Sequence, residues 1–213
     1  MEEKQEFTAE ENREIASQLR LPRGSNGDTI AQRMNSANAA LTTKAYECLS
    51  EFEGDEVLEI GFGNGRGLGP LIGSHKMVYG VDHSEFMVRE AARYHSRAVY
   101  ANRLRLEHGS ASMLAYPQDY FPKIVSVNTL YFWNPAQKVA RELLRVLKPG
   151  GVLVLGFRSR STVENLAFTE HGFNLYEAEE VEALLTEAGF VDIKWDASPD
   201  EDRDAVALSA RKP

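Results

Sequence analysis

The feature that most constrains this chain is a strand-like apolar run that leads directly into closely spaced glycines. Val57 to Ile60 form the run, and Gly61, Gly63, Gly65 and Gly67 follow at alternate positions. Glycine adopts positive φ at little cost and leaves room where a Cβ would clash with a bound group. A turn that only reverses the chain would need fewer glycines. The stretch therefore predicts a strand, a turn that seats a ligand, and a following helix.

Short apolar runs alternate with amphipathic stretches from about residue 55 onward, which is typical of strands joined by crossover helices. The connection from 198 to 204 is polar and too short for a crossover helix, so the last two runs are predicted to form a hairpin. The sequence thus predicts an α/β fold with an open, mostly parallel sheet whose last strand is inserted antiparallel. Its seven expected strands are 57–60, 77–81, 104–107, 124–127, 152–157, 191–195 and 205–210.

Helix signals fill the connections. Ser84 can cap a helix over 84–98, and Pro135 suits the first helical position of one over 135–147. A third helix is expected over 177–188, with Gly189 as its C-terminal cap.

The glycine spacing excludes two common phosphate-binding loops. A dinucleotide turn requires Gly-x-Gly-x-x-Gly, but Arg66, Leu68, Pro70 and Ile72 stand where its third glycine would be. The Gly-x-x-x-x-Gly-Lys-Ser/Thr loop is also missing, because the chain contains no Gly-Lys pair. The ligand of this turn therefore need not carry phosphate.

An acidic residue ends the next predicted strand. Asp82 stands 21 positions after Gly61, where a carboxylate can accept hydrogen bonds from both hydroxyls of a ribose that lies across the glycine turn. Asp82 could instead cap the helix that begins near Ser84. Together with the glycines, the ribose interpretation is favoured.

The first 54 residues carry no strand signal and are interpreted as a helical lid, distinct from a domain over 55–213. Thr8 and Glu11 form a capping box for a helix that ends near Leu21. A loop is expected at 24–27, and Asp28 is placed to cap a longer second helix.

The second helix should carry two stripes. An apolar stripe at steps of three and four predicts packing on the domain; it consists of Ile30, Met34, Ala37, Leu41, Ala45, Cys48 and Phe52. Beside it run Asn35, Asn38 and Thr42, and no charge occurs between Arg33 and Lys44. Such amides suit contact with a buried polar ligand; the alternative is that they cap turns or hydrogen-bond to neighbouring loops, and both interpretations stay open.

Five segments follow one another at the ends of the predicted strands. They are Leu58-Glu59-Ile60-Gly61-Phe62-Gly63-Asn64-Gly65, Gly80-Val81-Asp82, Gly109-Ser110-Ala111, Val127-Asn128 and Leu147-Lys148-Pro149-Gly150-Gly151. In this order and spacing the chain resembles the class I S-adenosylmethionine-dependent methyltransferases, over about 56–157. The resemblance implies a Rossmann-like fold, S-adenosylmethionine as cofactor and S-adenosylhomocysteine as product.

The resemblance also implies the residues around the cofactor. Gly61, Gly63 and Gly65 would border its methionine and ribose parts, with Glu59 anchoring the loop beneath them. Asp82 would bind the ribose hydroxyls.

The remaining implied contacts lie at either end of the cofactor. His83 would lie against the adenine, and Ser110 and Ala111 would contact the adenine edge. The family often has Asp where Ser110 stands, so this polar contact should be weaker. Asn128 would lie near the sulfonium and the acceptor.

Three consecutive aromatic residues follow Asn128 at a strand-to-helix loop. Active sites of open parallel sheets lie at such carboxyl ends, and aromatic faces there can attract a sulfonium and exclude water. Tyr131 and Trp133 are therefore expected in the pocket, and Phe132 in the core. With Met34, Asn35 and Asn38, they are the candidate substrate or lid residues.

The segment Asn128-Thr-Leu-Tyr-Phe-Trp133 and the Met34-Asn35-x-x-Asn38 helix are similar to small-molecule methyltransferases related to quinone-biosynthesis enzymes. The Asn-Pro-Pro-Tyr/Phe/Trp segment that accompanies methylation of nucleic acid bases or glutamine is missing. The net charge of -8 also has the wrong sign for binding phosphates. A small-molecule substrate is expected, and no nucleic acid partner.

Further expectations come from what the chain lacks. A single cysteine, Cys48, and an acidic start without an apolar signal segment favour a cytoplasmic location. The longest apolar run, 151–157, is too short to cross a membrane. The histidines have no metal-ligand spacing, so no metal is expected. The sequence indicates neither a catalytic base nor an oligomeric state.

Two other functions compete with methyl transfer. The chain could be a regulatory module that binds the cofactor without transferring its methyl group. It could also be an NAD-linked oxidoreductase, which the glycine spacing disfavours.

Overall fold

A single sheet with strand order β3-β2-β1-β4-β5-β7-β6 organises the protein. The computed structural model describes residues 7–197 and 205–213. Its strands are β1 (Glu56–Ile60), β2 (Met77–Asp82), β3 (Leu104–His108), β4 (Phe121–Val127), β5 (Leu147–Arg158), β6 (Val191–Ala197) and β7 (Ala205–Arg211). The pairs from β3 to β5 are parallel, whereas β7 is antiparallel to both β5 and β6. The predicted seven-stranded Rossmann-like sheet with its inserted antiparallel last strand is confirmed.

Helices connect the strands and precede them. They are α1 (Ala9–Arg20), α2 (Gly24–Ser50), α3 (Gly69–Ser74), α4 (Glu85–Tyr94), α5 (Ser96–Tyr100), α6 (Ala136–Val146), α7 (Arg160–Val163) and α8 (Ala178–Ala188), with 3₁₀ turns η1 (Arg66–Leu68), η2 (Leu130–Phe132) and η3 (Ala167–Glu170). No helix in the described part of the chain is long and apolar enough to span a bilayer. The predicted connection at 198–204 lies outside the described residues.

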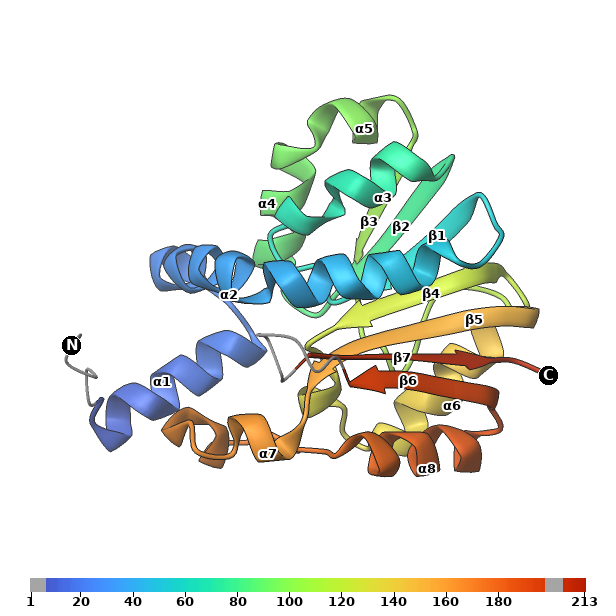
Figure 1. Cartoon of the computed structure of the whole chain (residues 1–213). Helices are drawn as coiled ribbons and strands as arrows, with labels where there is room; N and C mark the ends of the chain where they lie inside the picture. The colour runs from blue at the N-terminus through green and yellow to red at the C-terminus, as the bar shows by residue number, and fades with distance from the viewer. Residues whose placement is uncertain (1–6, 198–204) are drawn as a thin grey trace.

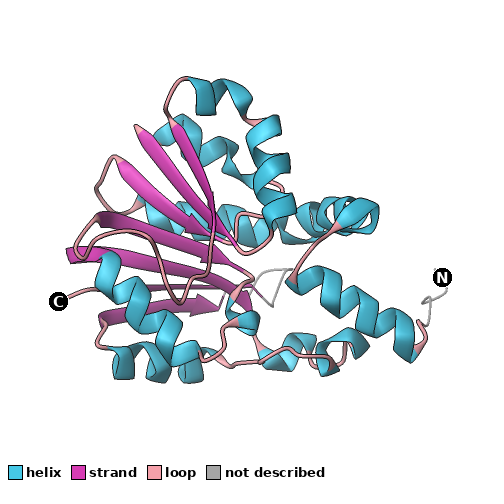
Figure 2. Cartoon of the chain, turned by 180° about the vertical axis from the view of Figure 1, so that it is seen from behind, coloured by secondary structure: helices cyan, strands magenta, loops and turns pink. Residues whose placement is uncertain are grey.

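The sheet is buried between two helical layers. On one face α6 and α8 contribute Leu143 and Leu185 to an apolar cluster. On the other face α2, α3 and α4 contribute Leu49, Leu71 and Ala91 to a second cluster. Figures 1 and 2 show these layers from opposite sides. Because the central strands are covered on both faces, their sequences are continuous apolar runs and do not alternate between apolar and polar residues.

Three local predictions are wrong. The expected loop at 24–27 is the start of α2, so Asp28 lies inside that helix and Arg23 is its N-cap residue. Glycine costs about 1 kcal/mol in a helix but does not forbid one. The helix expected over 84–98 is broken at His95, whose ring Nε2–H donates to Gly65 O at 2.7 Å. Pro135 is the N-cap residue of α6 rather than its first helical residue.

Only the second half of α2 packs on the sheet as predicted. Leu41 and Ala45 are fully buried, whereas Ala37 is exposed. The first half of α2 reaches beyond the sheet, over the carboxyl ends of the strands (Figure 1). The apolar stripe therefore ends where the sheet ends, and the residues before Leu41 face a different environment.

Hydrogen bonds fasten the N-terminal helices to the rest of the protein. The Ser84 hydroxyl donates to Pro22 O, between α1 and α2, at 2.7 Å. Farther along, Arg158 Nη2 donates to Ala37 O at 3.0 Å. Ser84 is also the N-cap of α4, because its Oγ accepts from Met87 N–H at 3.3 Å. One hydroxyl thus holds both the start of α4 and the turn between the first two helices.

The double role of Ser84 can be tested by substitution. Ser84→Ala removes a helix cap and leaves the buried Pro22 carbonyl without its donor, so the free energy of unfolding should fall by about 2 kcal/mol. Urea denaturation measures this loss, and limited proteolysis should cut faster between α1 and α2. Thr186→Ala is the control, since its hydroxyl bonds only locally to Glu182 O. Unchanged proteolysis of the Ser84 variant would contradict the proposed attachment.

Candidate functional site

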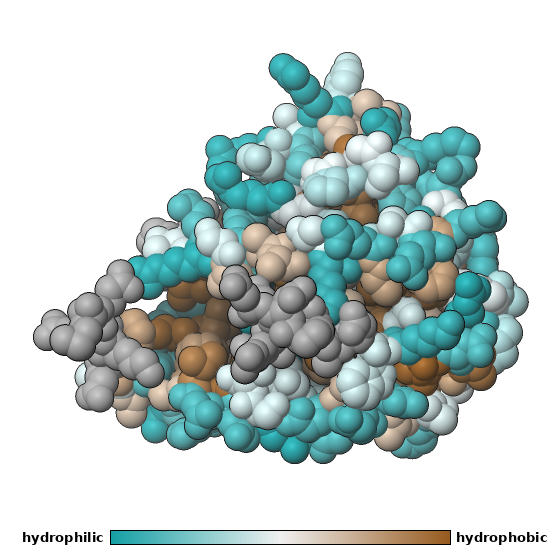
Figure 3. All heavy atoms as spheres, viewed as in Figure 1, coloured by the Kyte–Doolittle hydropathy of each residue, from teal (hydrophilic) through white to brown (hydrophobic). Residues whose placement is uncertain are grey.

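A cavity of about 940 Å³ lies at the carboxyl ends of the central strands, beneath α1 and α2. Its floor is the glycine turn after β1, the tip of β2 and the loop after β4, and its roof includes Leu19, Pro22 and Met34. In the space-filling view the surface is hollowed between α1 and α2, and apolar residues line the visible depth (Figure 3). The volume is at the upper end of the range for small-molecule sites.

Two glycines of the turn make the floor possible for different reasons. Gly61 has φ +75°, and a Cβ there would lie 2.2 Å from Thr129 Cγ2. Gly63 has φ +59°, and its missing Cβ would meet nothing within 4 Å. Gly61 therefore permits close packing of two loops, whereas Gly63 leaves bare backbone open to the cavity, which both residues line.

Gly65 does not line the cavity. It has φ +76°, and a Cβ there would lie 2.6 Å from the Ala91 Cβ on α4. Its carbonyl accepts the hydrogen bond from His95. The structure thus gives Gly65 a packing role between the turn and α4.

Asp82 fastens the tip of β2 to the glycine turn. Its Oδ2 accepts from Gly63 N–H and its Oδ1 accepts from Ser84 N–H, each at 2.8 Å. The N-cap of α4 is Ser84, so the alternative that Asp82 caps this helix is wrong. Burial raises the pKa of Asp82, and the two backbone hydrogen bonds oppose the rise. Each carboxylate oxygen can still accept from a ligand that enters the cavity.

A second buried carboxylate lies under the turn. Glu59 is 5% exposed, and its Oε2 accepts from the Tyr46 hydroxyl of α2 at 2.8 Å. Burial raises the pKa of Glu59 to about 7; the Tyr46 hydrogen bond opposes this, and the charge of Asp82 adds to it. Because Tyr46 belongs to α2, this bond connects the N-terminal helices directly to the floor of the cavity.

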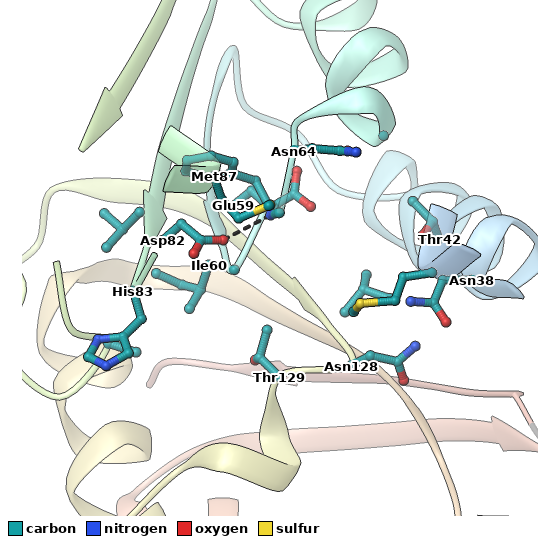
Figure 4. A pocket seen from close by; sticks show the side chains of 18 of the residues that line it. Asn38, Thr42, Glu59, Ile60, Asn64, Asp82, His83, Met87, Asn128 and Thr129 are labelled. Carbon is teal, nitrogen blue, oxygen red and sulfur yellow. Dashed lines mark hydrogen bonds between the residues drawn. The ribbon is translucent and has the colours of Figure 1, made fainter. Parts of the chain in front are cut away.

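The residues predicted for the adenine side are found at one end of the cavity. His83, Ser110 and Ala111 all line it. His83 is exposed, and Ser110 Oγ lies 3.0 Å from Ser112 Oγ. Figure 4 shows His83 beside Asp82, on the side of the cavity away from α2.

The opposite end of the cavity is lined by amides. Met34, Asn35 and Asn38 of α2 line it together with Asn128, which follows β4. Figure 4 shows Asn38 and Asn128 on the same side of the cavity, from the two elements that border it. Asn128 has φ +55°, and its N–H donates to Gly156 O at 2.7 Å. The amides of α2 therefore border the cavity, where they can contact a bound ligand.

The aromatic residues after Asn128 are arranged differently from the prediction. Trp133 lines the cavity as expected, but Phe132 lines it too, whereas Tyr131 does not. The Tyr131 hydroxyl is held inside by Arg158, accepting its N–H at 2.6 Å, and lies 3.1 Å from Asn128 Oδ1. Consecutive residues of the 3₁₀ turn point about 120° apart, so Tyr131 faces the interior while Phe132 reaches the cavity.

Some lining residues were not predicted. Leu19, Arg20 and Pro22 reach the cavity from the end of α1. Thr129 also lines it, and its Oγ1 accepts from Trp133 Nε1 at 3.1 Å and lies 2.5 Å from Ser126 Oγ. The residues at the end of α1 carry no local signal, since only chain folding brings them over the strand ends. Among the described residues, no group of three or more His, Cys, Asp or Glu could hold a metal ion.

Known proteins match this chain in sequence. The methyltransferase domain family matches residues 58–155. The uncharacterized methyltransferase YdaC of Bacillus subtilis is 30% identical over 182 residues, which cover 84% of this chain and 96% of YdaC. Erythromycin 3''-O-methyltransferase of Saccharopolyspora erythraea is 32% identical over 125 residues, or 58% of this chain and 41% of that enzyme. The chain therefore spans nearly all of YdaC but less than half of the erythromycin enzyme.

A solved structure matches the fold. A chain from a complex that contains the Haloferax volcanii Trm112 methyltransferase activator aligns with a TM-score of 0.73 and 19% identity. The alignment covers 94% of this chain and 98% of that one. At this identity the match shows a shared fold.

The raised pKa of Glu59 predicts a specific pH dependence of stability. Between its ordinary value of 4.5 and the folded value of about 7, the folded protein binds more protons at Glu59 than the unfolded chain. The contribution of Glu59 to the free energy of unfolding is therefore complete below pH 4.5 and is lost as the pH rises through about 7. Glu59→Gln should remove this pH dependence. Relative to the parent, the free energy of unfolding of the variant should rise by up to about 3 kcal/mol between pH 5 and 8.

Urea denaturation across this pH range measures the difference. Glu179→Gln, at an exposed position of α8, should follow the parent profile. Parallel profiles for the parent and Glu59→Gln would contradict the assignment.

Proposed function

The chain belongs to the class I S-adenosylmethionine-dependent methyltransferases, and from this membership we propose that it methylates a small molecule held beneath α1 and α2. The family implies S-adenosylmethionine as methyl donor. The observation that carries the proposal is the cavity itself, in which a glycine turn with open backbone and two buried carboxylates lie at one end and uncharged amides at the other. Family membership removes the NAD-linked oxidoreductase from consideration.

The residues present fit a nucleoside with a cationic methionine part. The bare backbone at Gly63 gives space for close approach, and Asp82 points a hydrogen-bonded carboxylate at the same place. We propose that Asp82 holds the ribose hydroxyls and that Glu59 supports the turn beneath the methionine part. Gly61 and Gly63 border the cofactor. Gly65 does not contact it, but lets the turn pack closely on α4.

The rest of the cofactor contacts extend from these anchors. His83 lies against the adenine, Ser110 and Ala111 border its edge, and Asn128 lies nearest to the reacting end. All four line the cavity. The hydroxyl of Ser110 lies 3.0 Å from Ser112 Oγ, and its contact with the adenine is weaker than that of the Asp that the family often has at this position.

Catalysis in this proposal depends on positioning. S-adenosylmethionine supplies an electrophilic methyl group: as the acceptor's lone pair bonds to the methyl carbon, the carbon–sulfur bond breaks and its electron pair stays on sulfur. The chain's own contribution is to orient the acceptor and exclude water. Orientation alone can lower a barrier by about 7 to 11 kcal/mol. Trp133, Phe132 and Met34 close the reacting end against solvent.

The segment 1–54 acts as the lid and 55–213 as the methyltransferase domain. Support comes from the attachments of α1 and α2, which reach the cavity floor through the Tyr46–Glu59 hydrogen bond and α4 through the Pro22–Ser84 bond. A small-molecule acceptor accords with the name of the erythromycin relative. A regulatory module without catalysis would bind the cofactor and show no turnover.

The cofactor seat is tested by matched glycine variants. Gly63→Val should weaken S-adenosylmethionine binding at least about tenfold, since the new side chain enters the cavity. Gly150→Val is the control, because Gly150 has a similar positive φ of +74° and open surroundings but lies outside the cavity. Calorimetric titration should show parent affinity for the Gly150 variant only. Equal affinities for both variants would refute the placement.

The acceptor end is tested by a second substitution. Asn38→Ala should leave S-adenosylmethionine affinity within about twofold of the parent and change turnover or acceptor KM by about tenfold, because the amide borders only the acceptor. Screening metabolite pools with labelled cofactor supplies the acceptor for this measurement. Unchanged turnover across all acceptors would remove the lid proposal.

A further inference from the structure

The two ends of the Asn128 side-chain amide have different environments. Its Oδ1 accepts a hydrogen bond from the Tyr131 hydroxyl at 3.1 Å. Its Nδ2 has no hydrogen-bond partner among the described residues, yet this atom is not closed to solvent. Asn128 lines the cavity, and Figure 4 shows its nitrogen turned toward the side of Asn38. The oxygen is therefore bonded inside the protein, and the NH2 group is open to the cavity.

The backbone of Asn128 is fixed, so only its side chain is left to turn. The residue has φ +55°, and its N–H donates to Gly156 O at 2.7 Å. An amide without an internal bond would rotate at this place, and a molecule that uses it would have to stop the rotation at a cost in conformational entropy. The bond from Tyr131 restricts the amide before any ligand binds.

Tyr131 is itself held at both its ring and its hydroxyl. The ring is 6% exposed and lies near Phe132 and Phe173, with ring centroids 6.2 and 5.9 Å away. The hydroxyl accepts Arg158 N–H at 2.6 Å, and its own hydrogen has two acceptors at 3.1 Å, Asn128 Oδ1 and Arg158 O. Burial raises the pKa of Tyr131 to about 12, so the hydroxyl keeps this hydrogen at neutral pH. Phenylalanine would fill the same space but could not bond the amide.

We propose that Tyr131 is a positioning residue, whose hydroxyl fixes Asn128 with the amide NH2 group directed into the cavity, where this group donates a hydrogen bond to the methyl acceptor. The inference rests on the proposed function, which puts Asn128 at the reacting end, and adds the residue that orients it. Tyr131 does not line the cavity, so its effect on the reaction passes through Asn128.

Nuclear magnetic relaxation of the side-chain amides tests the hold of Tyr131 on Asn128 and needs no acceptor. In the ¹⁵N-labelled full chain, the Asn128 signals are those that Asn128→Asp removes. The order parameter of this amide should be about 0.85 in the parent and below about 0.6 in Tyr131→Phe, because the freed amide turns. A mobile Asn128 amide in the parent, or a rigid one in Tyr131→Phe, would overturn the inference.

Tyr79→Phe is the matched control for the loss of a buried hydroxyl. Tyr79 is 7% exposed, its hydroxyl lies 3.2 Å from the Tyr120 hydroxyl, and it does not line the cavity. This variant loses the same atom and a comparable hydrogen bond, and the Asn128 amide should stay as rigid as in the parent. An equal loss of rigidity in Tyr79→Phe would overturn the assignment to the Tyr131 hydroxyl.

Turnover tests whether the fixed amide serves the reaction. With an acceptor from the metabolite screen, Tyr131→Phe should lower kcat about tenfold and keep the KM for S-adenosylmethionine within about twofold of the parent. In an Asn128→Ala background the same substitution should change kcat less than about twofold, since no amide is left to position. Equal losses in both backgrounds would reveal a purely structural role and overturn the inference.

Asn128→Asp tests the direction of the amide, because it keeps an oxygen for Tyr131 but has no NH2 group. Parent turnover in this variant would overturn the donor role. If the screen yields no acceptor, the relaxation results decide the inference by themselves. S-adenosylhomocysteine affinity is measured first in every variant. Loss of binding in the parent counts against the proposed function, whereas normal binding with a rigid amide in Tyr131→Phe defeats this inference alone.

Discussion

The hydrogen bonds of one buried carboxylate organise the functional end of this protein. Asp82 accepts from Gly63 N–H and from Ser84 N–H, so it joins the glycine turn, the tip of β2 and the start of α4. Together with the hydrogen bond from Gly61 N–H to Val81 O, this bridge fixes the bare backbone of the turn relative to the neighbouring strand. The pKa of Asp82 is raised because it is buried, and a carboxylate confined there is ready to accept hydrogen bonds from a ligand.

Hydrogen bonds from residues near the cavity floor also reach the N-terminal helices that form its roof. Ser84, which donates its N–H to Asp82, uses its hydroxyl to hold Pro22. Glu59, under the glycine turn, is bonded to Tyr46 of α2. The proposed cofactor site and the proposed lid are therefore connected by two short paths.

Several features of the site were predictable because their signals are local. The glycines, Asp82 and the amides of α2 were recognised from spacing alone, and the structure places Gly61, Gly63, Asp82 and Asn38 around one cavity. Predictions failed where neighbouring residues of the same type differ only in direction. Tyr131 turns inward and Phe132 outward within one 3₁₀ turn. Likewise, Gly65 looks like its neighbours in sequence, but Ala91 of α4 occupies the space beside it.

The sequence by itself determined the number of strands, the inserted antiparallel strand and the glycine turn, because these depend on periodicity, chain connectivity and glycine positions within short segments. The family was recognised from the resemblance of five such segments to known methyltransferases. Only the tertiary structure decided where α2 leaves the sheet and that α1 roofs the cavity. It also decided that Phe132 and Trp133, but not Tyr131, line the cavity. Those outcomes depend on contacts between segments far apart in the chain, and no local propensity encodes them.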